Sequence, residues 1–395
     1  MTIESTTSPA VRRRIRLGMV GGGQGAFIGG VHRIAARLDD RYELVAGALS
    51  SDPLRASASA AELHIARERS YADYHAMAKA EAARPDGIDV VAIVTPNHLH
   101  APIATAFLEA GIHVICDKPI TTTLAEAMAL VQRVRQTGRL FALTHNYSGY
   151  PMVRQARAMV AAGELGDIRV VQAEYPQDWL STDLEATGQK QATWRVDPAQ
   201  AGAGGSLGDI GTHAEHLARF ISGLELSEVS ADLSTFVRGR RLDDNAHVML
   251  RYSNGARGML WSSQVAPGNE NGLKVRVYGS KAGIEFRQEH PNQLWFTALG
   301  EPPRLLTRAG AGASPAAAHA TRIPAGHPEG YLEAFAQLYR DVADQLHARW
   351  EGVAPDPLAC TVPTVEDGAR GMKFIEATVA SSQANGQWTD ASLSF

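Results

Sequence analysis

Over the first 146 residues, short apolar stretches alternate with segments of helical periodicity. The predicted strands comprise residues 15–20, 43–49, 90–95, 113–117 and 140–144. Their nearly continuous apolar character is typical of strands that are covered on both faces of a sheet. An alternation of such strands with helices predicts βαβ units on a parallel sheet, so we expect an α/β fold here.

Two helices of this region have clear sequence signatures. The apolar face of the first follows the spacing i, i+3, i+4, i+7 and is predicted to comprise Val31, Ile34, Ala35 and Leu38. Thr123 and Glu126 form a capping box at the start of another helix, and Gly138 is placed to end it.

Beyond about residue 150 the pattern changes to strands that are joined by tight turns. Predicted hairpins pair residues 247–252 with 256–262, around Asn254-Gly255, and residues 274–278 with 283–286. Helices are expected at 152–162, 331–348 and 365–381, and the Ala/Gly-rich stretch 309–319 is expected to be a surface loop. The second half is therefore expected to be an α+β domain with antiparallel strands.

Composition and charge limit the classes of partner. The 38 Lys and Arg against 42 Asp and Glu leave a formal charge of −4, with no basic excess for nucleic acid. No stretch approaches 18 consecutive apolar residues, so no membrane-spanning helix is expected. Cys116 and Cys360 form neither a disulfide framework nor a zinc motif, which favours a reducing cytoplasm. A small-molecule partner is expected.

The first predicted strand leads directly into a glycine-rich stretch, GGGQGAFIGG at residues 21–30. Glycines at a strand-to-helix turn let the backbone approach a pyrophosphate, and the helix N-terminus offers free N–H groups. Two registers are possible, one using Gly21, Gly23 and Ala26, the other using Gly23, Gly25 and Gly29 in a longer loop. Both predict dinucleotide binding, whereas a tight turn without a ligand is the alternative.

The end of the second predicted strand bears on the choice between NAD and NADP. Ser50, Ser51 and Arg55 would suit a 2′-phosphate and slightly favour NADP. Asp52 could instead bind the ribose of NAD, or serve only as the N-cap of the helix that begins at Pro53.

A lysine follows the strand at 113–117, in the sequence Asp117-Lys118-Pro119. Ligands bind at the carboxyl ends of parallel strands, so the Lys118 ammonium is placed to stabilise an alkoxide during hydride transfer. A surface lysine that pairs with Asp117 is the alternative.

In the second half, Asp209 and His213 are spaced i, i+4 and share a face if a helix includes both. Oxidation of a secondary alcohol needs a base for the hydroxyl proton, and histidine titrates in the useful range. A capping aspartate with an incidental histidine is the alternative. Glu215 and His216 could extend the set to a metal site, but no further ligand pattern supports one, so no metal is expected.

Three loop segments mix aromatic and hydrogen-bonding groups: Tyr175-Pro176-Gln177-Asp178-Trp179, Trp194-Arg195 and His327-Pro328-Glu329-Gly330-Tyr331. Such groups suit a polyhydroxylated ring, although Trp179 and Trp194 could equally be anchors that pack on the core.

Together these residues resemble the glucose-fructose oxidoreductase, inositol dehydrogenase and rhizopine-catabolism (Gfo/Idh/MocA) family over nearly the whole chain. The glycine loop with His32 after it, TPNHLH at 95–100, DKP at 117–119 and GDIGTH at 208–213 carry the resemblance. It implies an N-terminal Rossmann domain and a C-terminal α+β domain on an open, mainly antiparallel sheet whose face mediates homo-oligomerisation as a dimer or tetramer. Two departures are the longer glycine loop and Asp117, where the family usually has Glu.

The resemblance also implies roles for individual residues and a division of the chain. It implies a catalytic set of Lys118, Asp209 and His213, and it places Thr95, Asn97 and His100 on the nicotinamide side of the cleft. We predict a flexible lead at 1–14, a Rossmann domain at 15–147 and a substrate-binding and oligomerisation domain at 148–395. The predicted cofactor contacts are Gly21, Gly23, Gly25, Ala26, Phe27, Ile28, Ser50, Ser51, Arg55, Thr95, Asn97, His100, Asp117, Lys118 and Asn146. The predicted substrate contacts are Lys118, Tyr147, Asp178, Trp179, Trp194, Arg195, Asp209, His213 and His327.

The function expected from these residues and the resemblance is an NAD- or NADP-dependent dehydrogenase that reversibly oxidises a secondary hydroxyl of a sugar, glycoside or inositol-like polyol. His213 would take the hydroxyl proton, Lys118 would stabilise the oxyanion, and Asp209 would orient the histidine. Redox-neutral glycoside cleavage or epimerisation through a transient ketone, and a non-catalytic NAD(P)-sensing protein, are the alternatives.

Overall fold

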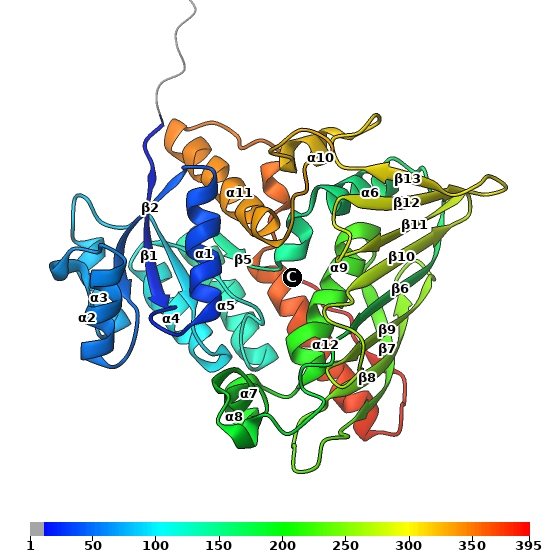
Figure 1. Ribbon diagram of the computed structural model, residues 1–395, viewed down its shortest axis with the longest axis horizontal. Coiled ribbons are helices and arrows are strands. Elements are labelled where there is room, and N and C mark those ends of the chain that lie inside the picture. Colours follow the sequence, from blue (N-terminus) through cyan, green and yellow to red (C-terminus); the bar gives the residue numbers. More distant parts are fainter. Residues whose placement is uncertain (1–11) are drawn as a thin grey trace, which may run out of the picture.

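Five parallel strands form the first sheet, in the order β2-β1-β3-β4-β5 (Figure 1). The structure is a computed structural model that describes residues 12–395. The strands are β1 (Ile15–Gly21), β2 (Tyr42–Ala48), β3 (Val90–Val94), β4 (His113–Cys116) and β5 (Phe141–Leu143). The helices between and beside them are α1 (Phe27–Leu38), α2 (Pro53–Glu62), α3 (Tyr74–Ala82), α4 (His100–Glu109) and α5 (Leu124–Thr137). Each of the five predicted strands is present within one residue, so the predicted α/β fold is confirmed.

The capping signals of α5 act as the sequence predicts. The Thr123 hydroxyl accepts a hydrogen bond from the Glu126 amide, and the Glu126 carboxylate accepts one from the Thr123 amide. Gly138 ends the helix with a φ of 62°, a left-handed conformation that glycine adopts without strain.

The buried face of α1 differs from the predicted one. Val31 and Ala35 are buried, but Ile34 and Leu38, which belong to the same predicted apolar face, are 40% and 43% exposed. His32 is fully buried instead. It is accommodated because both ring nitrogens have hydrogen-bond partners, so the histidine does not leave an unpaired polar group in the core.

Helix α11 (Tyr331–Glu351) completes the core of the first sheet, although it lies far along the chain. It packs against α1 (Figure 1), and its buried side chains share one apolar cluster with Ile15, Leu17 and Met19 of β1. The α11 members of this cluster are Phe335, Ala336, Leu338, Tyr339, Val342, Ala343 and Leu346. The division of the chain into two domains at residue 147 stays a prediction. Helix α11 lies in the second predicted domain by sequence, but it packs in the core of the first.

Nine strands form the second sheet, in the order β13-β12-β11-β10-β6-β9-β8-β7-β14. They are β6 (Ile168–Pro176), β7 (Leu226–Ser234), β8 (Asn245–Tyr252), β9 (Arg257–Ser263), β10 (Lys274–Gly279), β11 (Ala282–Arg287), β12 (Gln293–Ala298), β13 (Arg304–Thr307) and β14 (Thr389–Asp390). Within residues 12–395, β6 and β9 are the only neighbouring strands of this sheet that pair in parallel, so the sheet is mainly antiparallel, as predicted. The two predicted hairpins are β8–β9 and β10–β11.

Helices cover the face of the second sheet that is turned toward the first (Figure 1). The remaining helices are α6 (Pro151–Ala161), α7 (Lys190–Arg195), α8 (Pro198–Ala201), α9 (Thr212–Ser222), α10 (Pro315–Ala320) and α12 (Val365–Gln383). The other face of the sheet carries exposed large side chains, among them Met249, Met259, Tyr278 and Trp295.

One expectation about an irregular segment needs correction. The predicted loop at 309–319 contains α10, because Ser314 caps the Ala317 amide and Pro315 suits the first helical position. Of the predicted flexible lead at 1–14, residues 1–11 lie outside the described part. Arg13 and Arg14 are held by ion pairs to Asp89 and Asp40.

Within residues 12–395, no helix combines the length and apolar character needed to cross a membrane.

Candidate active site

A cleft of about 1190 Å³ lies between the carboxyl ends of the first sheet and the helix-covered side of the second. The loops after β1, β2, β3 and β4 form one wall, and residues from β6, α7, α9 and the loop before β10 form the other. Most of the predicted site residues line this cleft: Gly21, Gly23, Ala26, Phe27, Ile28, Ser50, Ser51, Arg55, Thr95, Asn97, Asp117, Lys118, Asn146, Tyr147, Trp179, Trp194, Arg195, Asp209 and His213.

The glycine loop combines features of both predicted registers. Gly21 and Gly22 make the turn with φ values of 80° and 70°. A Cβ on Gly29 would lie only 2.4 Å from the Cα of Gly22, so Gly29 is the residue that lets α1 pack against the turn. Helix α1 begins at Phe27, and no side chain of the described residues caps it, which leaves its first N–H groups available to an anion.

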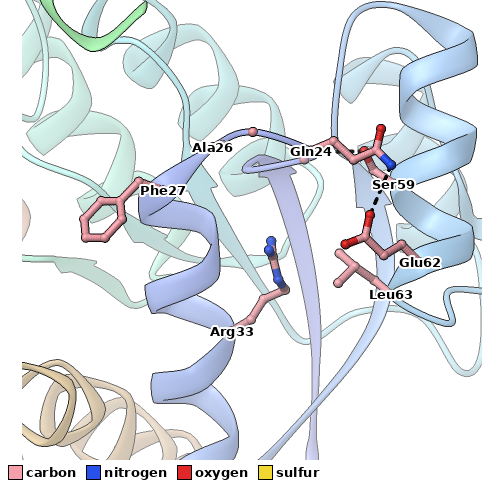
Figure 2. Close-up of a pocket in the computed structure, with 9 residues that line it drawn as sticks. Gln24, Ala26, Phe27, Arg33, Ser59, Glu62 and Leu63 are labelled. Atoms are coloured by element: carbon pink, nitrogen blue, oxygen red, sulfur yellow. Dashed lines mark hydrogen bonds between the residues drawn. The ribbon is translucent and has the colours of Figure 1, made fainter.

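Gly25 does not line the main cleft, contrary to its predicted role. It borders a neighbouring cavity of about 360 Å³ between the glycine loop and α2 (Figure 2). There the amide of Gln24 donates to Ser59 Oγ at 3.0 Å, and its side chain donates to Glu62 at 3.1 Å. These hydrogen bonds therefore attach the longer glycine loop to α2.

The close approach of Gly29 to Gly22 gives a stability prediction. Gly29→Ala is expected to destabilise the fold by about 1–3 kcal/mol, because its Cβ would meet backbone atoms that cannot move aside. Gly30→Ala is the matched control, since the nearest atom to its Cβ would be 4.0 Å away, at the end of the Arg33 side chain. Denaturant unfolding of both variants would measure the difference, and equal free energies of unfolding would contradict the role of Gly29.

The carboxylate of Asp52 is committed to capping α2. It accepts hydrogen bonds from the Leu54 amide at 2.9 Å and the Arg55 amide at 3.1 Å. Ser50, Ser51 and the Arg55 side chain line the cleft at this end, while Asp52 does not. The geometry corresponds to the capping alternative for Asp52.

Two buried polar atoms in the cleft lack a hydrogen-bond partner among the described residues, namely Thr95 Oγ1 and Asn146 Nδ2. Such atoms are costly to leave unpaired, so they point to a polar ligand beside them. The glycine turn, the uncapped start of α1 and this donor and acceptor together fit a dinucleotide that lies along the carboxyl edge of the first sheet.

His100 does not line the cleft, contrary to its predicted position. It is fully buried, with Nδ1 2.7 Å from the Pro119 carbonyl oxygen and Nε2 2.9 Å from that of Thr95. It therefore joins the loops that follow β3 and β4. Asp117 accepts hydrogen bonds from His32 at 2.9 Å and Thr144 at 2.6 Å, so this carboxylate is anchored at the cleft floor.

Lys118 and Asp209 form an ion pair across the cleft. Lys118 Nζ donates to Asp209 Oδ1 at 3.0 Å and also to the Asp209 carbonyl oxygen. Arg195 and Gln264 donate to Asp209 Oδ2 at 3.2 and 2.9 Å. Burial alone would raise the pKa of Asp209, but the charges of Lys118 and Arg195 outweigh it and hold the pKa well below its ordinary value. Asp209 is therefore a permanent anion that fixes the lysine.

His213 lies on α9 beside this pair and is 7% exposed. Its Nδ1 is 3.5 Å from Nδ1 of the buried His145, and its ring lies 4.8 Å from that of Tyr147. Burial and then the charge of Lys118 lower the pKa of His213 well below 6.5, so the imidazole is neutral at pH 7. No hydrogen bond joins it to Asp209 within the described residues, so the expectation that Asp209 orients His213 needs correction.

A π-helical turn, Leu207–Gly211, explains how Asp209 and His213 reach the cleft together. It precedes α9 directly, and Asp243 holds its start by accepting hydrogen bonds from the Gly205 and Leu207 amides. Within this turn, the Asp209 carbonyl oxygen accepts a hydrogen bond from Lys118.

Two predicted substrate contacts lie away from the cleft. The Asp178 carboxylate accepts a hydrogen bond from the Gly268 amide at 3.2 Å and does not line the cleft. His327 is exposed, and its carbonyl oxygen accepts from the buried Arg308. The HPEGY segment is instead organised by Glu329, which pairs with Arg308 at 3.0 Å.

Several polar residues of the cleft were not predicted as contacts: Gln177, Gln191, Glu270, Asn271 and Gln288. Gln177 lies within the segment Tyr175–Trp179, which mixes aromatic and hydrogen-bonding groups. Asn271 and Gln288 flank β10 and β11, where no motif marks them.

Within residues 12–395, no group of three His, Cys, Asp or Glu side chains is arranged to hold a metal ion.

Both halves of the chain resemble domains of known proteins. Residues 15–145 match an oxidoreductase family with an NAD-binding Rossmann fold, and residues 153–285 match the GFO/IDH/MocA C-terminal domain. A crystal structure of an oxidoreductase from Sinorhizobium meliloti is 57% identical, with a TM-score of 0.87 over 95% of this chain and 99% of that one. An inositol dehydrogenase homolog from Azotobacter vinelandii, complexed with NADH and myo-inositol, is 39% identical, with a TM-score of 0.88 over 96% and 98%.

A levoglucosan dehydrogenase from Pseudarthrobacter phenanthrenivorans is 32% identical over 310 residues, which are 71% of this chain and 76% of that protein. The two family matches cover consecutive segments of the chain, and they agree with the parallel nucleotide-binding sheet and the mainly antiparallel second sheet. The chain therefore belongs to the Gfo/Idh/MocA family of NAD-binding oxidoreductases.

Proposed function

We propose that the protein is a dehydrogenase that reversibly oxidises a secondary hydroxyl of a cyclic polyol, sugar or glycoside with NAD or NADP. One arrangement carries the proposal. The amine of Lys118, from the end of β4, and the imidazole of His213, from α9, line the same cleft as the glycine loop. The inositol and levoglucosan dehydrogenase relatives support a substrate of this class.

The two side chains have complementary tasks in this reaction. Oxidation removes a proton from the hydroxyl oxygen and a hydride from the carbon that bears it. When bound, NAD(P)⁺ supplies the hydride acceptor. His213 takes the proton, because its ring is neutral and its Nε2 has no partner among the described residues. Lys118 donates a hydrogen bond to the substrate oxygen and stabilises the charge that develops there. Asp209 is a positioning residue that holds the Lys118 amine.

A panel of polyols and glycosides with both cofactors tests the function. We expect reduced nicotinamide and a ketone to appear in equal amounts with at least one of myo-inositol, levoglucosan or a related glycoside. Product without net reduced nicotinamide would instead support cleavage or epimerisation through a transient ketone. Cofactor binding without turnover of any compound would favour a sensing protein.

The adenosine end of the cleft supports a preference for NADP. With Asp52 engaged by α2, Ser50, Ser51 and Arg55 are left to bind a 2′-phosphate. Arg55→Ala is expected to raise the KM for NADP about 10-fold or more and to leave that for NAD nearly unchanged. The exposed Arg67, outside the cleft, provides the control variant Arg67→Ala. Equal effects of Arg55→Ala on both cofactors would contradict the preference.

We also propose a homo-oligomer, a dimer or tetramer, formed through the uncovered face of the second sheet. The pairing of Met249 with Met259 on adjacent strands supports this, because both side chains are exposed on that face.

Cys116 and Cys360 are unpaired and support a reducing cytoplasm as the location.

A further inference from the structure

A chain of four hydrogen bonds crosses the second-sheet wall of the cleft. Trp179 Nε1 donates to Gln177 Oε1 at 3.1 Å, and Gln177 Nε2 donates to Asn271 Oδ1 at 2.7 Å. From the other side, the Tyr175 hydroxyl donates to the same Asn271 oxygen at 2.7 Å, and its oxygen lies 2.5 Å from that of Tyr147. All five side chains line the cleft.

The direction of every bond in this chain follows from Trp179. An indole N–H can only donate, so Gln177 must present its oxygen to Trp179 and its amide nitrogen to Asn271. Asn271 therefore accepts on Oδ1. The single Tyr175 proton is used toward Asn271, so the Tyr147 hydroxyl must be the donor in the pair of phenols.

This directed chain leaves the amide nitrogen of Asn271 able to bind a ligand. Asn271 Nδ2 donates no close hydrogen bond within residues 12–395 and is not enclosed. One of its N–H groups lies near the Tyr147 oxygen, which leaves the other available in the cleft. Because the Tyr147 proton is already donated, its oxygen can only accept. The wall thus offers a fixed donor at Asn271, beside Tyr147, and Tyr147 packs against the ring of His213.

We propose that Asn271 is a specificity-determining residue that binds a second hydroxyl of the substrate, distinct from the one that is oxidised, by donating a hydrogen bond to its oxygen. This inference rests on the proposed dehydrogenase function and narrows its substrate class. The substrate is a polyhydroxylated ring, because a simple secondary alcohol would leave the oriented Asn271 amide unpaired. Asn271 binds and does not take part in proton or hydride transfer.

Substrate analogues that change one hydroxyl at a time provide the test. Myo-inositol and levoglucosan would each be compared with their monodeoxy and monodeoxyfluoro analogues, because fluorine can accept a hydrogen bond but cannot donate one. In the wild-type enzyme, one monodeoxy analogue is expected to lose about 10- to 100-fold in kcat/KM, and the fluoro analogue at that position should lose less.

Two variants of Asn271 should change this ranking in different ways. Asn271→Ala is expected to raise the KM of the parent about 10-fold or more with little change in kcat, and to make the hydroxyl, fluoro and deoxy compounds nearly equivalent. Asn271→Asp keeps the oxygen that Tyr175 and Gln177 require but can only accept, so it should reject the fluoro analogue as strongly as the deoxy one. Unfolding temperature and NADH affinity would verify that both variants are folded.

Asn269→Ala is the matched control, because Asn269 lies in the same loop, donates to the Ala266 carbonyl oxygen and does not line the cleft. Binding of each compound to the enzyme–NADH complex would be measured alongside turnover. If the wild-type protein oxidises polyols but Asn271→Ala leaves the analogue penalties unchanged, the inference about Asn271 is overturned and the proposed function stands. If no polyol is bound or oxidised, both are overturned.

Discussion

Replacing Lys118 by alanine is expected to lower kcat/KM for polyol oxidation by about 10²- to 10³-fold, the loss usual when one donor to a developing oxyanion is removed. The side chain reaches the cleft from the end of β4 and is fixed there by Asp209. Its removal takes away positive charge at the substrate oxygen and leaves the glycine loop untouched. The affinity for NADH, measured by fluorescence, should therefore change little while the rate of hydride transfer falls.

The control for this variant is Lys79→Ala, an exposed lysine on α3 that does not line the cleft. Lys118→Met provides a second variant that retains most of the side-chain volume. Turnover by both Lys118 variants at the wild-type rate would remove this lysine from the mechanism.

His213→Asn should cost about 10²- to 10⁴-fold in kcat, the range for loss of a general base. It should also change the pH profile. The base acts in its neutral form, and burial together with Lys118 lowers the pKa of His213 well below 6.5. In the wild-type enzyme kcat/KM should therefore stay high through pH 6.5 and fall only as the pH drops through this lowered pKa. The variant should lack that acidic limb.

Initial rates across the pH range would measure both effects, with His327→Asn as the control because His327 is exposed and outside the cleft. An acidic limb that persists unchanged in His213→Asn would assign the base to another group.

The sequence was sufficient to predict the elements whose signals are local. Strand ends, the capping box of Thr123 and Glu126, and the hairpins depend on a few adjacent residues, and these predictions are confirmed. The family motifs also bring Lys118, Asp209 and His213 to one cleft, although their catalytic roles stay predictions.

What the sequence did not predict depends on contacts between distant segments. The apolar face predicted for α1 includes the exposed Ile34 and Leu38. The buried residue His32 has its partners, Asp117 and Tyr339, far along the chain. His100 is placed by backbone carbonyls rather than by a ligand. Asn271 has no motif, and its orientation follows only from its bonds to Tyr175 and Gln177.

The position of α11 has a consequence for how the protein is made. Its apolar side chains fill the cluster around Ile15, Leu17 and Met19, yet they are encoded more than three-quarters of the way along the message. While a ribosome is still translating the second sheet, the nucleotide-binding half has exposed apolar surface where this helix will sit. That half can reach its final packing only after residue 351 has left the exit tunnel, so completion of its core must wait until most of the second sheet has been translated.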